Sequence, residues 1–133
     1  MNKILYIIFC GFILYSCGRS TNVIRFDHKQ YTTTDTVLII VKPDSYISSL
    51  LTRFEPLLVN ADTFKVEYYE IGSVEASSSV SYDLIINKIL EQAKSHGAQA
   101  LINLEKYEAG YYNPSYGWIE EPTIKGIMIR FKN

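Results

Sequence analysis

SYDLIINKILEQAKSHGAQALINLEKY, residues 81–107, is the stretch that decides the fold, because a helical pattern changes into a strand pattern inside it. Over 81–97 the apolar residues recur at intervals of three and four, which places them on one face of a helix. Ser81 can cap the first turn of this helix, and Gly97 can take the left-handed conformation that ends one. Over 99–107 apolar and polar residues alternate, which predicts a strand with one buried face. The helical stripe comprises Tyr82, Ile85, Ile86, Ile89, Leu90 and Ala93, and the strand face comprises Ala100, Ile102 and Leu104.

Three further strands are predicted on either side of this stretch. TVLIIV at 36–41 is a continuous run of mostly β-branched residues, which is typical of a buried strand. FKVEYYEIGSVEA at 64–76 predicts a second strand, with a break at Gly72. TIKGIMIRF at 123–131 alternates again and predicts the last strand.

A short helix is also predicted over 45–54, where apolar residues follow a possible Ser45 cap, and Pro56 would end it. Together the segments predict an α+β domain: a small mixed β-sheet of about four strands, with one main helix packed on one face, in the order β-β-α-β-β, and a possible short extra helix. The main helix is expected to make a right-handed crossover between parallel neighbouring strands, and the last two strands to form an antiparallel hairpin. Between those two strands, 108–122 contains turn-forming residues and predicts a long loop.

The beginning of the chain predicts export and lipid attachment. A positively charged start is followed by an apolar run over 4–15, which is shorter than the roughly 20 residues that cross a bilayer and suits a signal peptide. Leu14-Tyr15-Ser16-Cys17 resembles a bacterial lipobox, in which the cysteine thiol receives lipid and becomes the mature N-terminus. Attached acyl chains would anchor the protein stably in a membrane. The alternative is a plain signal peptide or a short anchor helix with an incidental cysteine.

This interpretation divides the chain into three parts. Residues 1–16 are expected to be a lipoprotein signal peptide, 17–35 the lipidated cysteine and a polar tether, and 36–133 a single α+β domain. Gly18 follows the cysteine where the aspartate that retains lipoproteins at the inner membrane would stand. The resemblance therefore favours the bacterial outer membrane, with the periplasmic and surface sides both open.

Composition excludes several classes of function. Lys and Arg total 13 and Asp and Glu total 14, and this near balance argues against a nucleic-acid partner. With Cys10 in the predicted signal peptide and Cys17 lipidated, the mature chain can make neither a disulfide nor a cysteine metal site. His28 and His96 have no further ligands at a recognisable spacing, so no metal and no cofactor is predicted. No nucleophile or carboxylate pair stands in a catalytic pattern, so an enzyme is not expected.

The segment 108–122 contains a cluster of aromatic residues, Tyr111, Tyr112, Tyr116 and Trp118. Such side chains anchor interfaces, because they offer large contact areas at a low entropy cost. The favoured alternative is that they fold back over the uncovered face of the sheet. Separately, Asp35-Thr36-Val37 resembles the short acceptor pattern for O-glycans in exported bacterial proteins, which makes Thr36 a possible acceptor, although Thr36 could instead begin a strand.

YYEIGSV at 68–74 and AKSHGAQALINL at 93–104 resemble small bacterial envelope lipoproteins of the YbjQ and RcsF fold family. YTTTDTVLII at 31–40 resembles the stretch before their first strand. The resemblance implies an envelope lipoprotein with a fold of that kind. Members have been described as binding heavy metals or containing disulfides, whereas this chain lacks the residues for both.

These observations favour a membrane-anchored lipoprotein of the cell envelope that acts as a non-catalytic interaction or sensor module. Its expected contacts are the membrane, through lipid on Cys17, and an envelope protein. The alternative is a self-assembling domain that forms a ring-like homo-oligomer without a ligand, as YbjQ-type domains do. An enzyme or a metal binder is the third choice, and it would require His28, His96 and a carboxylate to meet in the fold.

Overall fold

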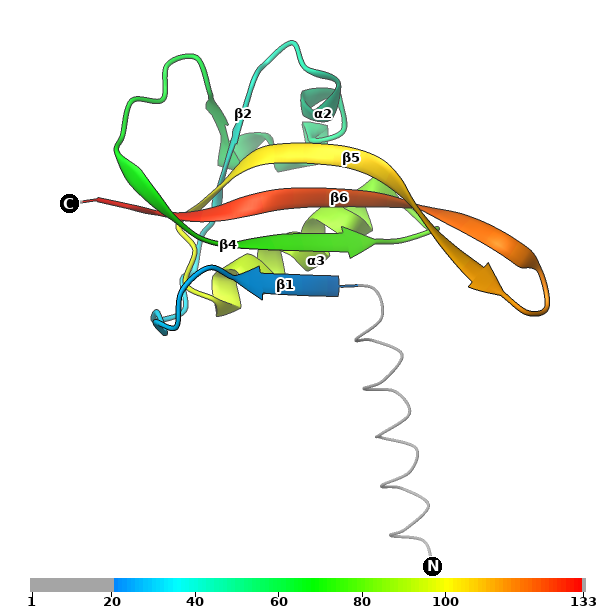
Figure 1. Cartoon of the computed structure of the whole chain (residues 1–133). Helices are drawn as coiled ribbons and strands as arrows, with labels where there is room; N and C mark the ends of the chain where they lie inside the picture. Colours follow the sequence, from blue (N-terminus) through cyan, green and yellow to red (C-terminus); the bar gives the residue numbers. More distant parts are fainter. Residues whose placement is uncertain (1–20, 133) are drawn as a thin grey trace, which may run out of the picture.

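A computed structural model describes residues 21–132, which form one mixed six-stranded sheet with its helices on one face (Figure 1). The strand order is β1-β4-β6-β5-β2-β3. All pairs are antiparallel except β5–β2 and β2–β3, which are parallel. The strands are β1 (Thr21–Arg25), β2 (Leu38–Val41), β3 (Leu58–Asn60), β4 (Tyr68–Ser77), β5 (Ala100–Asn113) and β6 (Gly117–Phe131), and the helices are α2 (Tyr46–Ser49), the 3-10 helix η1 (Thr52–Leu57) and α3 (Tyr82–Ser95).

The amphipathic helix expected over 81–97 is confirmed as α3. The Ser81 hydroxyl accepts a hydrogen bond from the backbone N–H of Leu84 at 3.2 Å and caps the first turn. Gly97 has a φ of +78°, which lets the chain leave the helix and enter β5 directly. The buried face of α3 packs against the central strands and consists of Ile85, Ile86, Ile89, Leu90 and Ala93.

The opposite face of the sheet, here called the open face, is only partly covered. A smaller apolar cluster of Ile40, Ala100, Ile102 and Ile129 lies there, and Phe64 packs against it from the segment that precedes β4. That cluster lies at the far end of β6, near Phe131. Toward the other end of β6 the open face carries polar and tyrosine side chains, and these form the site described below.

The prediction of about four strands with one main helix, in the order β-β-α-β-β, was wrong, because residues 21–132 form six strands and three small helices. The two unpredicted strands are short edge strands, and neither has a clear alternation. One of them, β1, lies inside the segment 17–35 that we expected to be a polar tether. The other, β3, follows directly after η1. Short strands of this kind are stabilised by pairing with a neighbouring strand rather than by their own pattern.

Two further expectations were also wrong in detail. The crossover through α3 does not join neighbours, because β6 lies between the parallel strands β4 and β5. The helix predicted over 45–54 begins after Ser45 as expected, but it is divided into α2 and η1. Pro56 lies inside η1 instead of ending a helix before it. The antiparallel hairpin of the last two strands is confirmed.

A β-bulge in β5 sets which side chains reach each face. Asn103 has a φ of 53°, and the register shifts between Ile102 and Glu105. Leu104 consequently packs in the core under α3, whereas Ala100 and Ile102 belong to the cluster on the open face. The expectation that these three residues share one face was therefore wrong, because the extra residue of a bulge changes the phase of the strand.

The segment 108–122 is not a loop but the outer part of the β5–β6 hairpin. The pairing continues to Asn113 and Gly117, where the Asn113 side chain accepts a hydrogen bond from the backbone N–H of Ser115 at 2.8 Å. Gly117 has a φ of +82°, as tight hairpin turns require. Because β4 ends at Ser77, opposite Thr123, only two strands remain beyond that point. We call residues 108–122 the distal ribbon; it projects from one end of the sheet (Figure 1).

Candidate functional site

The aromatic residues of the distal ribbon are divided between its two faces. Tyr112 lies directly opposite Trp118 in the register, and both belong to the face that continues the helix side of the sheet. The indole of Trp118 also covers Gly110, where an added Cβ would come within 2.4 Å of the ring. Tyr111, paired with Ile119, belongs to the face that continues the open face. The aromatic cluster seen in the sequence is therefore two surfaces rather than one.

These aromatic side chains do not fold back over the open face. Tyr111, Tyr112, Tyr116 and Trp118 are between 45% and 83% exposed, and Tyr116 in the turn is the most exposed of the four. The ribbon projects beyond the sheet (Figure 1), and its aromatic side chains are exposed to solvent on both faces. An exposed group of large aromatic side chains is characteristic of an interaction surface.

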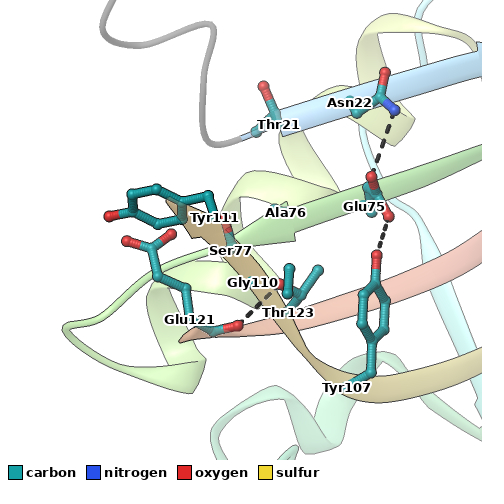
Figure 2. A pocket seen from close by; sticks show the side chains of 11 residues that line it. Thr21, Asn22, Glu75, Ala76, Ser77, Tyr107, Gly110, Tyr111, Glu121 and Thr123 are labelled. Atoms are coloured by element: carbon teal, nitrogen blue, oxygen red, sulfur yellow. Dashed lines mark hydrogen bonds between the residues drawn. The ribbon is translucent and has the colours of Figure 1, made fainter. Parts of the chain in front are cut away.

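A groove of about 610 Å³ lies on the open face, at the base of the distal ribbon (Figure 2). Its volume is within the range of ligand sites, although it is open rather than enclosed. One wall comes from β1 and the end of β4, and the other comes from the paired residues of β5 and β6. Its lining consists of Thr21, Asn22, Glu75, Ala76, Ser77, Tyr107, Ala109, Gly110, Tyr111, Glu121 and Thr123.

Glu75 is held in place by donors from two other strands. The Tyr107 hydroxyl donates a hydrogen bond to one carboxylate oxygen, and the Asn22 amide donates to the other at 3.4 Å. The hydrogen bond to Glu75, reinforced by burial and by the negative charge, raises the pKa of Tyr107 to about 12. Tyr107 therefore stays protonated at neutral pH and acts as a hydrogen-bond donor. The result is a carboxylate with a fixed orientation in the groove (Figure 2).

Glu121 and Tyr111 form the other side of the groove, on the distal ribbon (Figure 2). Between residues 21 and 132 the structure records no hydrogen bond or ion pair to the Glu121 carboxylate. Lys125 is the register partner of Glu75 on β6, yet it is not part of the lining and makes no recorded ion pair with Glu75. The lining of this part of the chain thus contains two carboxylates and no lysine or arginine.

On the helix side, Lys106 joins the base of the ribbon to the helices. Its ammonium lies 5.2 Å from the ring centre of Tyr82 and 5.5 Å from that of Tyr46, and 3.7 Å from the Glu108 carboxylate. The Tyr82 hydroxyl raises the pKa of Lys106 most; burial opposes this rise, and the Tyr46 and Glu108 groups add smaller increases, so the net shift of the pKa is upward. These contacts hold the two-stranded ribbon against α2 and α3 at its base.

The predicted site residues fall in different places. Cys17 lies outside the described residues. Thr36 is exposed and precedes β2, so it does not begin that strand. Within residues 21–132, which include His28 and His96, no group of three or more metal-ligating side chains is placed to hold a metal ion. Across the same residues, no helix is long and apolar enough to cross a membrane.

Sequence reasoning missed Glu75, Tyr107 and Asn22 as members of one site. Glu75 and Tyr107 are 32 residues apart, and no spacing in the sequence connects them. Only the insertion of β6 between β4 and β5 brings the two side chains to the same face. No pattern in the sequence places Glu121 in the site either, because its position on the groove face depends on the register of β6.

Compared with known proteins, the chain matches no protein-family model, no curated protein and no solved structure. The resemblance to the YbjQ and RcsF lipoproteins therefore stays a prediction from short motifs. A fold alone does not define an activity, so the groove and the distal ribbon are the features of this chain that bear on its function.

Proposed function

We propose that this chain is a lipid-anchored, non-catalytic interaction module of the bacterial outer membrane, and that the groove at the base of the distal ribbon binds its partner. The observation that carries the proposal is the fixed Glu75 carboxylate, held by Tyr107 and Asn22 inside a concave surface. A polar group that is oriented before binding favours recognition, because less entropy is lost when a partner arrives.

The same lining supports binding rather than catalysis. It contains no histidine, cysteine or lysine, the residues that most often act as bases or nucleophiles near neutral pH. Tyr107, with its raised pKa, holds its proton too firmly to act as an acid at that pH. The exposed rings and carboxylates instead offer contact area and hydrogen-bond acceptors to a partner.

The anchor is tested on the protein extracted from membranes. We expect the mature chain to begin at Cys17 and to carry the added mass of acyl chains in intact-mass analysis. The Cys17→Ser variant should lack that mass and leave the membrane fraction. A mature chain that begins elsewhere, or that carries no acyl mass, would contradict the anchored part of the proposal.

The groove is tested with a photo-crosslinking residue placed at Ala109 in cells, with Glu91 on the exposed side of α3 as the reference position. We expect one discrete protein adduct from position 109 and none from position 91. Glu121→Gln should weaken that adduct about two- to fivefold, the effect of losing one partly exposed ion pair. Glu120→Gln removes the same charge from the opposite face of the ribbon and should change nothing. Equal effects of the two substitutions would rule out the groove as the binding surface.

Self-assembly is a second candidate, supported by the edge strand β1. Ile24 and Phe26 beside this edge are each about half exposed, at 53% and 50%. Unpaired edges of this kind are templates for pairing with another chain. Light scattering across a concentration series should then detect a dimer or a larger ring, and Ile24→Lys should abolish it. A monomer at every concentration would eliminate this candidate.

A further inference from the structure

The tip of the distal ribbon differs chemically from its base. YYNPSYGWI, residues 111–119, contains no charged side chain, whereas Glu108, Glu120 and Glu121 lie immediately behind it. Its large side chains include three tyrosines and a tryptophan, which prefer the boundary between lipid and water because one end is apolar and the other polar. The tip is thus an uncharged aromatic surface bordered by carboxylates.

The position of β1 brings this tip close to the predicted anchor. Thr21 pairs with Ala76 at the ribbon end of β4, and it also lines the groove beneath the ribbon. Cys17 is only four residues before Thr21, so a fully extended link reaches about 14 Å. The six residues of β5 in the ribbon, 108–113, span about 20 Å at the usual rise of a strand. The ribbon is therefore longer than the link between the sheet and the lipid.

We propose that the tip of the distal ribbon, residues 111–119, lies in the lipid interface of the membrane that anchors this chain. The proposal rests on the lipidation of Cys17 proposed above. A link shorter than the ribbon holds this end of the sheet against the bilayer, and the aromatic tip is the part that projects furthest from that end (Figure 1).

Two features limit how deeply the tip enters. Both edges of the two-stranded ribbon have unpaired backbone groups, which excludes it from the hydrocarbon core. The carboxylates behind the tip stay in water, because burial of an unpaired charge is costly. Three residues of each strand lie beyond the Gly110–Glu120 pair, about 10 Å of ribbon, which matches the depth of the interfacial layer.

Trp118 is the only tryptophan in the chain, and it serves as the probe. The lipidated protein is reconstituted in phosphatidylcholine vesicles that contain lipids brominated either near the carbonyl groups or near the chain ends. We expect a blue-shifted emission and stronger quenching by the shallow bromines than by the deep ones. Tyr116→Glu places a charge in the exposed turn and should reduce the shallow quenching about twofold or more.

The matched control moves the tryptophan to the other end of the sheet. Tyr68→Trp combined with Trp118→Phe places the probe beside Phe131, far from the ribbon, and should give no quenching by either lipid. Vesicle flotation and intact mass measure the anchor in the same samples. Protein that does not float refutes the anchor and, with it, the proposal that depends on it.

Two outcomes with floating protein would overturn the inference alone. In the first outcome, neither brominated lipid quenches the emission of Trp118, and acrylamide quenches it as strongly as it quenches the control tryptophan. In the second outcome, Trp118 becomes protected from acrylamide only after an envelope protein extract is added, which would indicate a protein partner for the tip.

Discussion

The inner and outer halves of the β5–β6 hairpin share one register but have different surroundings. In the inner half, β6 lies between β4 and β5 and contributes buried side chains to both faces of the sheet, among them Met128 and Ile129. In the outer half, the same two strands have no further neighbour, and their aromatic side chains face solvent. A two-stranded ribbon is marginally stable by itself, so its persistence depends on the inner half and on the contacts of Lys106. The comparison shows that the inner half of the hairpin stabilises the sheet, whereas the outer half is free for the recognition role that we propose.

The largest contrast is expected from one substitution made at both ends of β6. Ile129 is fully buried in the inner half, and Ile129→Ala should cost about 2–5 kcal/mol of unfolding free energy. Ile119→Ala, on the same strand in the distal ribbon, should cost less than about 1 kcal/mol. Chemical denaturation followed by circular dichroism measures both values. Similar losses at the two sites would show that the ribbon is part of the cooperative core.

A smaller contrast is expected from two glycines. A Cβ on Gly72 would meet the backbone carbonyl of Ile24 at 2.6 Å, so β1 would have to shift, and Gly72→Ala should cost about 1–3 kcal/mol. The atoms nearest to a Cβ on Gly110 all belong to the movable indole of Trp118. Gly110→Ala should therefore cost less than about 1 kcal/mol and should change the emission of Trp118. The comparison of the two halves fails if Gly110→Ala proves the more destabilising substitution.

The smallest effect is expected at Tyr107, where the two halves meet. Its pKa is raised to about 12, so the folded chain keeps this proton at pH values where the unfolded chain has lost it. The stabilisation is complete below about pH 10 and disappears as the pH rises toward 12. Solvent around this partly exposed hydroxyl keeps the effect small.

Denaturation between pH 9 and 12 should show a steeper loss of stability in the wild type than in Tyr107→Phe. Tyr111→Phe, on the same face of β5, is the matched control and should follow the wild type. Identical slopes for the wild type and Tyr107→Phe would mean that the hydrogen bond to Glu75 does not persist in solution.

The sequence predicted the parts of the fold that depend on local periodicity. Three features of α3 depend only on residues that are close together in the sequence: its apolar stripe, its Ser81 cap and its end at Gly97. The structure confirms all three. Pairing with a distant strand is not visible in such a pattern, which explains why β1, β3 and the placement of β6 were missed. The distal ribbon was mistaken for a loop because its Gly and Asn-Pro signals mark only the turn between two strands.

The candidate site was predictable only in part. The exposed aromatic residues were identified from composition, but their division between two faces depends on the register of β5 and β6. Glu75 and Tyr107 could not be paired, because their contact reaches across β6. Residues on one face of a helix are three or four positions apart in the sequence, so the sequence predicts their contact. Residues that meet because of the order of strands in a sheet have no fixed separation in the sequence.

The bulge at Asn103 also determines where β5 can lose a residue from its sequence without a change of face in the rest of the strand. Asn103 and Leu104 together oppose Gly126, so the loss of Asn103 would restore plain alternation and leave every outer residue on its present face. The loss of one residue between 105 and 109 would have the opposite result, since a one-residue slip reverses the faces of everything beyond it. A deletion of Tyr107, for instance, would turn Glu108 toward the groove and Ala109 away from it. We therefore expect the deletion of a single residue from β5 to be tolerated at position 103 and to abolish the groove when it occurs further along the strand.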